Sequence, residues 1–212
     1  MRRYQELIEF QMSTGNNEIY NMLNVKYFIV EDSTRQQNVQ RNPMTNGNAW
    51  FVKEYILVNN ADAEMDSLTH FNSKERAVID KRFSDQLNGF KIVSDSSSKI
   101  SETSYVPNKL VYQSDATSAQ MAVFSEIYYD LGWNAYVDGK LTPHFRCDYV
   151  LRGMIVPAGK HTIEFKFEPT IVKKGETIAL YSSILLYGGI ISIGGLLYFR
   201  RRKESENEIK PD

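Results

Sequence analysis

Carboxylates are the side chains of this sequence with the widest scope for acid–base chemistry. They are numerous in the C-terminal half and include Glu126, Asp130, Asp138 and Asp148. Two carboxylates that converge can act as an acid–base pair. The sequence determines no distance between any two of these, and a solvated β surface with aspartates at its turns explains them better than an acid–base pair does. We therefore predict no catalytic residue.

Nucleophiles and metal ligands are sparse. Cys147 is the only cysteine, so no disulfide can form within the chain, and it has no obvious histidine partner. The three histidines, His70, His144 and His161, are widely spaced and form no metal-ligand pattern. Neither a glycine-rich phosphate loop nor a nucleophile elbow is found. The sequence predicts no metal site and no cofactor.

One aromatic group could bind a ligand. Tyr128, Tyr129 and Trp133 lie close together in the sequence. Exposed rings can stack on the apolar faces of sugars, while nearby Asp and Asn side chains bind hydroxyls. The alternative interpretation is that Trp133 fills the core of a β-sandwich, as a tryptophan in such a strand often does.

The overall charge argues against a polyanionic partner. The net charge is −1, with 42% hydrophobic and 24% charged residues, so most of the chain can bury a core. No basic patch interleaved with aromatic residues marks a nucleic-acid site, and we predict no nucleic-acid partner.

The C-terminal half has a β pattern throughout. Asp138-Gly139 is a strong hairpin signal, because both residues tolerate the positive φ angles of a type I′ turn. A second turn runs from Pro157 through Gly159, and residues 161–168 then alternate apolar and polar, as in a half-exposed antiparallel strand. The remaining predicted strands are 99–106, 109–113, 121–129, 133–137 and 149–156. Short strands separated by turns favour an antiparallel β-sandwich.

The N-terminal half mixes helices and strands, which makes the predicted fold class α+β and mainly β. Short helices are expected at 3–13 and around 19–23, and strands at 25–30 and 49–58. The polar stretch 33–48 predicts a loop. Segments 61–71 and 73–83 predict helical turns, although Ala77–Ile79 could instead form a short strand.

The stretch Thr177–Phe199 carries no charge, and about 20 apolar residues suffice to cross a bilayer as a helix. We therefore predict a transmembrane helix in contact with lipid. Gly188, Ser192 and Gly195 could form a smooth face against a neighbouring helix, although glycine is in any case common in membrane helices.

The flanking charges predict the orientation. Arg200–Lys203 follows the span with four cations, whereas Lys173 and Lys174 precede it. By the positive-inside rule the C-terminus is cytoplasmic and residues 1–175 are extracytoplasmic. The N-terminal residues contain no signal-peptide-like apolar run. We therefore expect further spans upstream, in a longer protein, to export this region; a tail-anchored protein with a cytosolic head is the alternative.

The sequence resembles the C-terminal region of the YfhO family, which are bacterial integral membrane proteins placed among the GT-C glycosyltransferases. The resemblance rests on short motifs in a fixed order before a terminal span: Arg2-Arg3-Tyr4, residues 22–27, residues 48–52, Glu126, Tyr128-Tyr129, Gly132-Trp133, Asp138-Gly139-Lys140, Arg152-Gly153, Pro157–His161 and Pro169.

The resemblance implies a parent protein in the bacterial cell membrane that transfers a lipid-linked sugar to a cell-envelope glycan. GT-C enzymes usually carry the catalytic carboxylate in an early extracytoplasmic loop, so no catalytic residue is carried over. We predict a non-catalytic accessory domain. The alternatives are a membrane-anchored carbohydrate-binding or adhesion module and a structural subunit of a membrane complex. The predicted parts are 1–107 (α+β), 108–175 (β-sandwich), 176–199 (transmembrane) and 200–212 (charged tail).

Overall fold

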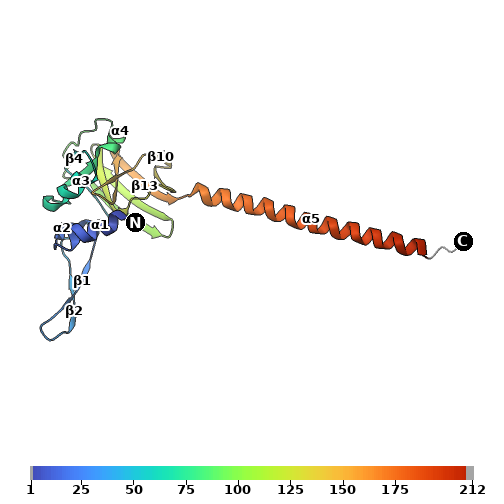
Figure 1. Ribbon diagram of the computed structural model, residues 1–212. Coiled ribbons are helices and arrows are strands. Elements are labelled where there is room, and N and C mark those ends of the chain that lie inside the picture. The colour runs from blue at the N-terminus through green and yellow to red at the C-terminus, as the bar shows by residue number, and fades with distance from the viewer. Residues whose placement is uncertain (1, 209–212) are drawn as a thin grey trace. The chain divides into compact units, whose positions relative to one another are not determined.

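The structure, a computed structural model, describes residues 2–208. The chain divides into two compact units, Met1–Glu168 and Pro169–Asp212. The first is mainly β, with short helices toward its N-terminus, and the second is one long helix (Figure 1). The predicted class, mainly β with short N-terminal helices and one long C-terminal apolar helix, is confirmed.

Two antiparallel sheets form the sandwich. The five-stranded sheet has the order β10 (Lys140–Thr142), β9 (Trp133–Val137), β13 (Gly159–Phe167), β7 (Lys109–Ala116) and β6 (Lys99–Val106). The four-stranded sheet has the order β11 (Phe145–Cys147), β12 (Leu151–Val156), β8 (Gln120–Ile127) and β3 (Ala49–Phe51). The hairpin predicted at Asp138-Gly139 joins β9 to β10, with φ angles of 49° and 79° at the two turn residues.

A compact aromatic cluster fills the space between the two sheets. Tyr112 of β7, Phe124 of β8 and Phe165 of β13 are fully buried. The ring centroid of Phe124 lies 4.9 Å from that of Tyr112 and 4.9 Å from that of Phe165, in edge-to-face geometry. Such contacts add to the stabilisation from apolar burial alone. We call this cluster, with the smaller apolar residues around it, the sandwich core.

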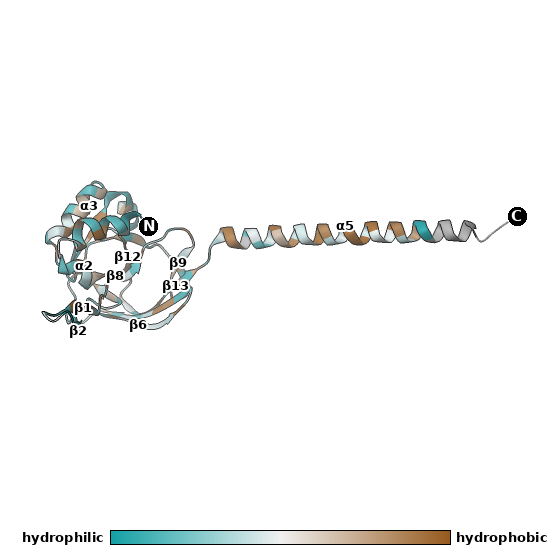
Figure 2. Ribbon diagram, turned by 60° about the horizontal axis from the view of Figure 1, so that its bottom comes forward, coloured by the Kyte–Doolittle hydropathy of each residue, from teal (hydrophilic) through white to brown (hydrophobic). Residues whose placement is uncertain are grey.

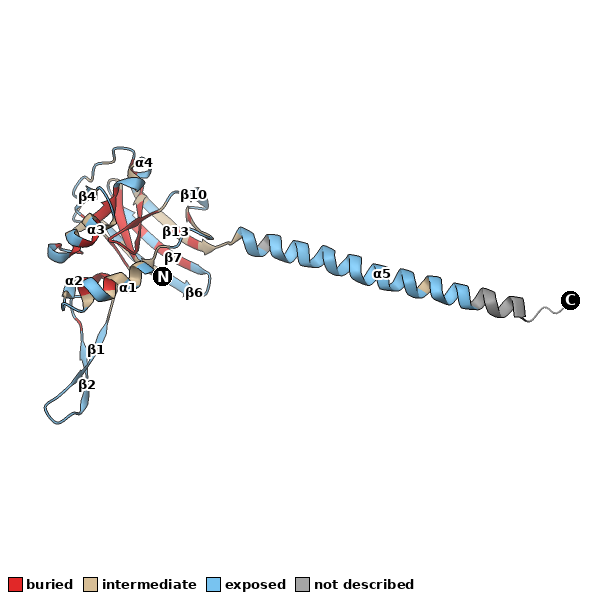
Figure 3. Cartoon of the chain, viewed as in Figure 1, coloured by how far each residue is buried: buried red, intermediate tan, exposed pale blue. Residues whose placement is uncertain are grey.

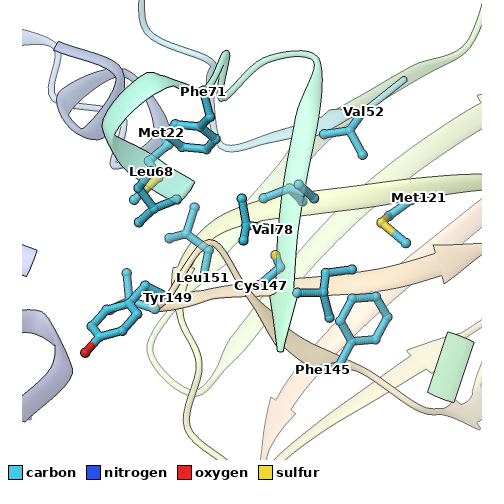
Figure 4. Close-up of a cluster of buried hydrophobic side chains, with 14 of the residues drawn as sticks. Met22, Val52, Leu68, Phe71, Val78, Met121, Phe145, Cys147, Tyr149 and Leu151 are labelled. Carbon is cyan, nitrogen blue, oxygen red and sulfur yellow. The ribbon is translucent and has the colours of Figure 1, made fainter. Parts of the chain in front are cut away.

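The four-stranded sheet is buried on both faces. In β8, Ala122 and Phe124 belong to the sandwich core, while Met121 and Val123 belong to a second cluster, the helical core. This is why residues 121–124 read as a continuous apolar run. Figure 3 shows the buried strands in red at the centre of the first unit, and Figure 4 shows side chains of the helical core.

The helical core is closed by short N-terminal elements. These are α1 (Arg2–Leu7), the π-helical turn η1 (Ile8–Met12), α2 (Asn17–Met22), α3 (Ala61–Ser67), and the 3₁₀ turn η2 (Leu68–His70). Leu7, Ile19 and Leu68 are fully buried in it. The spacing of apolar residues in the sequence therefore located the helices near 3–13 and 19–23, although η1 departs from regular α geometry.

Two local predictions for the first half of the chain are wrong in part. Residues 49–58 form two strands, β3 and β4 (Glu54–Val58), which belong to different sheets. The segment 73–83 contains β5 (Arg76–Asp80) instead of helical turns, and only the 3₁₀ turn η3 (Lys81–Phe83) is helical. The strand alternative for Ala77–Ile79 is the correct one. β5 pairs with β4 in parallel, a departure from the antiparallel pattern elsewhere, and its residues 77–80 are buried.

The loop predicted at 33–48 is also wrong in part, because it contains a strand. β2 (Gln37–Arg41) pairs with β1 (Tyr27–Glu31) in a two-stranded hairpin that projects from the rest of the unit (Figure 1). The polar composition of β2 concealed it, because both of its faces are exposed. The short helix α4 (Ser84–Leu87) follows η3 and is capped at its C-terminus by Asn88, whose φ is 45°.

The second unit is the helix α5 (Thr170–Glu208). Residues Thr170–Arg201 are long and apolar enough to span a membrane, by length and composition. Figure 2 shows white-to-brown, hydrophobic colouring along much of this helix. The helix extends past the predicted span on both sides, into the predicted charged tail, of which residues 209–212 lie outside the described chain.

Candidate functional site

The structure separates the three aromatic residues predicted to contact a glycan. Tyr128 and Tyr129, just past the end of β8, line a cavity of about 290 Å³. The Tyr128 amide donates to the carbonyl of Val150 at 2.7 Å, which holds this segment beside the chain that follows β11. Tyr129 is 48% exposed. These two rings therefore lie together at a hollow of the surface.

Trp133 has different neighbours. Its ring is partly buried against the sandwich core. The Arg152 guanidinium lies 4.3 Å from the Trp133 ring centroid, and the Phe167 ring centroid lies 5.4 Å away. Trp133 does not line the cavity that Tyr128 and Tyr129 share.

Arginines and tyrosines dominate the lining of this cavity. The residues are Arg2, Arg3, Tyr4, Ile127, Tyr128, Tyr129, Arg146, Tyr149 and Val150. We call it the arginine–tyrosine pocket. Three of its side chains are cationic and none is a carboxylate. Such a lining favours a ligand that carries negative charge and also presents an apolar face.

One buried carboxylate bonds to two arginines of the pocket. Glu64 of α3 is fully buried. Its Oε2 accepts from Arg3 Nη1 at 3.1 Å and from Arg146 Nη2 at 3.3 Å, and its Oε1 accepts from the Tyr149 amide at 3.1 Å. Burial raises the pKa of Glu64, and the two arginines oppose that shift. One carboxylate thus serves two guanidinium groups.

Arg146 is left with unused hydrogen-bonding capacity. It lies in β11 and its side chain is 9% exposed. Its Nε has no hydrogen-bond partner among the described residues. Its Nη2 is 3.8 Å from Asp80 Oδ2, beyond hydrogen-bonding distance, and Asp80 itself pairs with Arg82. A buried guanidinium donor without an acceptor is unusual, because such groups are normally satisfied.

Tyr149, one of the aromatic residues that line the pocket, lies in a strained turn. Asp148 and Tyr149 have φ angles of 48° and 70°, in the left-handed region that side chains other than glycine seldom adopt. Backbone strain of this kind costs energy and persists where surrounding contacts enforce it. Here the Asp148 amide donates to the Val78 carbonyl at 2.8 Å, and the Val78 amide donates to Asp148 Oδ1 at 2.7 Å.

The strained turn directs Tyr149 outward. Figure 4 shows its ring at the edge of the helical core, with the hydroxyl pointing away from the other labelled side chains. That hydroxyl donates to Glu6 Oε2 at 2.6 Å. The Arg3 guanidinium lies 4.4 Å from the Tyr149 ring centroid and its Nη1 is 3.4 Å from the Tyr149 carbonyl oxygen. Tyr149 and Arg3 therefore hold each other in place.

Cys147 and the carboxylates considered as acids in the sequence lie outside the lining of the arginine–tyrosine pocket. Cys147 is fully buried and burial raises its thiol pKa. Burial also raises the pKa of the Asp148 carboxyl to about 8. Both are core groups. Glu126 is half-buried and burial raises its pKa, with Arg152 opposing the shift. Asp130 lies exposed beyond the end of β8.

The turn residues singled out in the sequence meet at His161. Its Nδ1 is 2.6 Å from Asp138 Oδ2 and its Nε2 is 2.9 Å from the Ala158 carbonyl oxygen. Asp138 raises the pKa of His161. Gly139 and Gly159 have positive φ angles, while Pro157 is exposed between β12 and β13. The hydrogen bonds from His161 thus link the Asp138-Gly139 turn to the turn through Gly159.

The small residues of α5 leave one stripe of the helix smooth. Ser192 Oγ donates to the Gly188 carbonyl at 2.8 Å, so this hydroxyl is satisfied within its own helix. A Cβ added at Gly188 or Gly195 would meet nothing within 4 Å.

Three larger hollows lack the chemistry of the arginine–tyrosine pocket. One, of about 410 Å³, lies beside Trp50 and is rich in serine and lysine. A second, of about 550 Å³, lies at the base of the β1–β2 hairpin and has several asparagines. The third, of about 330 Å³, lies beside His144 and has no arginine or tyrosine in its lining. Among residues 2–208, no three His, Cys, Asp or Glu side chains are placed to hold a metal ion.

Sequence reasoning missed four residues of the site: Arg3, Glu64, Arg146 and Tyr149. One signal was available, because Arg146 interrupts the apolar pair Phe145 and Cys147, and a charge in a buried run requires a partner. Its partner Glu64 is remote in sequence and lies in an otherwise ordinary helical pattern. Only the folded chain brings the two together.

Comparison with known families provides one match. Residues 84–179 match the family model described as bacterial membrane protein YfhO. The matched region runs from α4 into the first turns of α5. It includes Tyr128, Tyr129, Arg146 and Tyr149. No curated protein and no solved structure matches significantly.

Proposed function

Through residues 84–179 this chain belongs to the YfhO family of bacterial membrane proteins, and from that premise we propose that it forms an extracytoplasmic accessory domain and the membrane span that anchors it. The domain is non-catalytic. The parent protein resembles a GT-C glycosyltransferase, with further spans upstream, and acts on cell-envelope glycans. The domain positions the acceptor glycan or covers the membrane active site.

The observation that carries this proposal is the direct connection between a well-packed β unit and an apolar helix. β13 ends at Phe167 and α5 begins at Thr170. Two lysines precede the apolar stretch, and Arg200–Lys203 follows it. Cationic residues are retained on the cytoplasmic side of a span. The β unit therefore belongs on the outer face of the membrane.

Cysteine labelling of the full-length protein in intact bacteria tests the topology. The native Cys147 is fully buried, so it contributes little background. Lys140→Cys places a thiol at the exposed first residue of β10, and Ser205→Cys places one in the charged tail. A membrane-impermeant maleimide should label the first variant in intact cells and the second only after the cells are lysed. The reverse pattern would place the β unit in the cytoplasm and overturn the proposal.

The accessory role has its own test. Deleting residues 1–168 from the parent while retaining its spans should abolish or strongly reduce sugar transfer to the envelope. Tyr105→Ala, at an exposed position of the β6–β7 hairpin, serves as the control. Normal glycosylation by the deletion variant would show that the β unit is dispensable for transfer.

A further inference from the structure

We propose that the arginine–tyrosine pocket binds a saccharide unit that carries an anionic group, either a phosphate or a carboxylate. This inference rests on the proposed function, because it names the class of glycan that the accessory domain would hold. It assigns the binding to Arg3, Arg146, Tyr128, Tyr129 and Tyr149, which the fold brings together from α1 and from the regions around β8 and β11.

The charge of the pocket calls for an anion. Three arginines line it, and the buried carboxylate of Glu64 accepts from two of them through the same oxygen. Arg2 pairs with Glu6 on the surface at 2.7 Å. Arg3 and Arg146 therefore share Glu64 as their close carboxylate partner, with Asp80 more distant at 3.8 Å from Arg146. A phosphate or carboxylate oxygen in the pocket would supply the missing acceptor.

The unsatisfied donor makes this requirement specific. Arg146 Nε is buried and has no partner among the described residues, and the side chain as a whole is only 9% exposed. Leaving such a donor unpaired costs stability. Guanidinium groups recognise planar or tetrahedral oxyanions through paired N–H donors. Protein atoms cover Nε, so an oxyanion in the pocket would contact it only after the Arg146 side chain turned toward the pocket, and that contact would remove this cost.

The tyrosines indicate that the ligand also has an apolar face. Tyr128 is fixed by ring contacts, with its ring centroid 5.9 Å from that of Phe83 and 5.5 Å from that of His144. Tyr149 is fixed by Arg3 and Glu6. Two preorganised rings and the more exposed Tyr129 suit the face of a sugar ring, since ordering them on binding costs little entropy.

The dimensions limit the ligand to a small unit. The cavity volume of about 290 Å³ lies at the lower end of the range for small-molecule sites, roughly 300 Å³ and above. A single charged sugar residue fits this size better than a folded peptide or a nucleic acid. A longer glycan would enter through one residue and leave its neighbours in solvent.

Binding to the purified full chain in lipid nanodiscs tests the inference. The probes are glucose 1-phosphate and glucuronate as anionic sugars, glucose as the neutral sugar, and inorganic phosphate as the bare anion. Titration calorimetry should give affinities for both anionic sugars about tenfold tighter, or more, than for glucose or phosphate, because only they engage arginines and tyrosines together. Equal affinity for glucose would remove the role of charge, and equal affinity for phosphate would remove the role of the rings.

Two variants locate the binding. Arg3→Gln should weaken glucose 1-phosphate binding by roughly tenfold and glucose binding much less, whereas Tyr129→Ala should weaken both sugars to a similar extent. The matched controls are Arg76→Gln, at an exposed arginine paired with Glu54, and Tyr105→Ala. Thermal unfolding of each variant reports whether it is folded. If both variants fold and bind as the wild type does, the pocket is not the site.

The binding test can fail without contradicting the proposed function. Cysteine labelling reads the topology without any ligand, and the deletion reads the accessory role in cells. Should the pocket variants bind normally while labelling and deletion behave as expected, the accessory domain stands and the pocket assignment fails. Should labelling place the β unit in the cytoplasm, an envelope glycan is excluded whatever the pocket binds.

Discussion

Among single residues, Gly153 shows how tightly the four-stranded sheet is packed. It lies in β12 opposite Phe145 of β11. A Cβ at this position would lie 2.6 Å from Phe145 Cε2 and 3.1 Å from Cys147 Sγ. Its φ is outside the positive range that favours glycine, so packing against the helical core, and not backbone geometry, requires the missing side chain.

We expect Gly153→Ala to destabilise the domain by about 1–3 kcal/mol, the usual cost of overpacking a well-filled core. Chemical denaturation measures it. Because the clash involves the Phe145 ring, Phe145→Leu should cost less in the Gly153→Ala background than in the wild type. Additive effects in the double-mutant cycle would show that the two positions do not compete for the same space.

Asp148 offers a prediction with a defined pH dependence. Burial raises the pKa of its carboxyl to about 8 in the folded state, well above the value near 3.9 for an unfolded chain. A carboxyl whose pKa is raised in the folded state makes its largest contribution to the free energy of unfolding below about pH 4, where it is protonated in both states. That contribution is lost as the pH rises toward 8, because the unfolded chain ionises first.

We expect Asp148→Asn to be nearly neutral near pH 4 and to stabilise the domain by more than about 1 kcal/mol near pH 8, given that one pKa unit corresponds to about 1.4 kcal/mol. Asparagine tolerates the positive φ and keeps the Oδ1 acceptor for the Val78 amide. Denaturation across roughly pH 4–9 measures the difference. Asp66→Asn, at an exposed position, is the control, and a pH-independent difference would contradict the buried acid.

The strand β13 and the helix α5 differ in how their apolar residues are distributed. β13 alternates in sequence because one of its faces points into the sandwich core, with Ile163 and Phe165 fully buried. α5 carries its apolar residues on every side, with none of the apolar window buried within the chain. A helix with this pattern requires lipid or another helix around it.

The smooth stripe of α5 predicts close packing against a second helix. Gly188→Leu adds a large side chain where small residues at positions 188, 192 and 195 would allow backbones to approach. We expect it to reduce cross-linking or energy transfer between α5 and a neighbouring span in membranes. Gly189→Leu is the matched control, because residue 189 points to a different side of the helix from residue 188. Equal effects of the two variants would show that no specific face is used.

Across the β unit as a whole, the two cores share one sheet. Alternate residues of β8 enter the sandwich core and the helical core, so neither core can be lost while the sheet remains intact. The chain carries two tryptophans, and they sample the two regions: Trp50 is buried in the helical core, and Trp133 packs beside the sandwich core.

We therefore expect the β unit to unfold in a single transition. Trp50→Phe leaves Trp133 as the fluorescent probe, and Trp133→Phe leaves Trp50. Relative to its own variant's circular dichroism transition, each tryptophan should report the same midpoint in denaturant, which is the mark of two-state unfolding. A fluorescence midpoint that differs from the circular dichroism midpoint would show that the two cores unfold independently.

Local periodicity and composition were enough to predict several elements. The period-two alternation of residues 161–168 predicted β13, the Asp138-Gly139 pair predicted the hairpin, and the uncharged stretch predicted α5. Each depends on neighbours a few residues away, so the pattern and the physical cause lie in the same short segment.

Which distant residues meet is known only from the packed fold. The sequence of β5 fits helical turns or a short strand, and pairing with β4 in parallel beside the helical core makes it a strand. In the same way, Arg3, Glu64 and Arg146 form one ion cluster because α1, α3 and β11 pack together. Glu64 is 61 residues from Arg3 and 82 residues from Arg146 in the sequence. Only the packing of distant elements creates these contacts, so no local spacing predicts them.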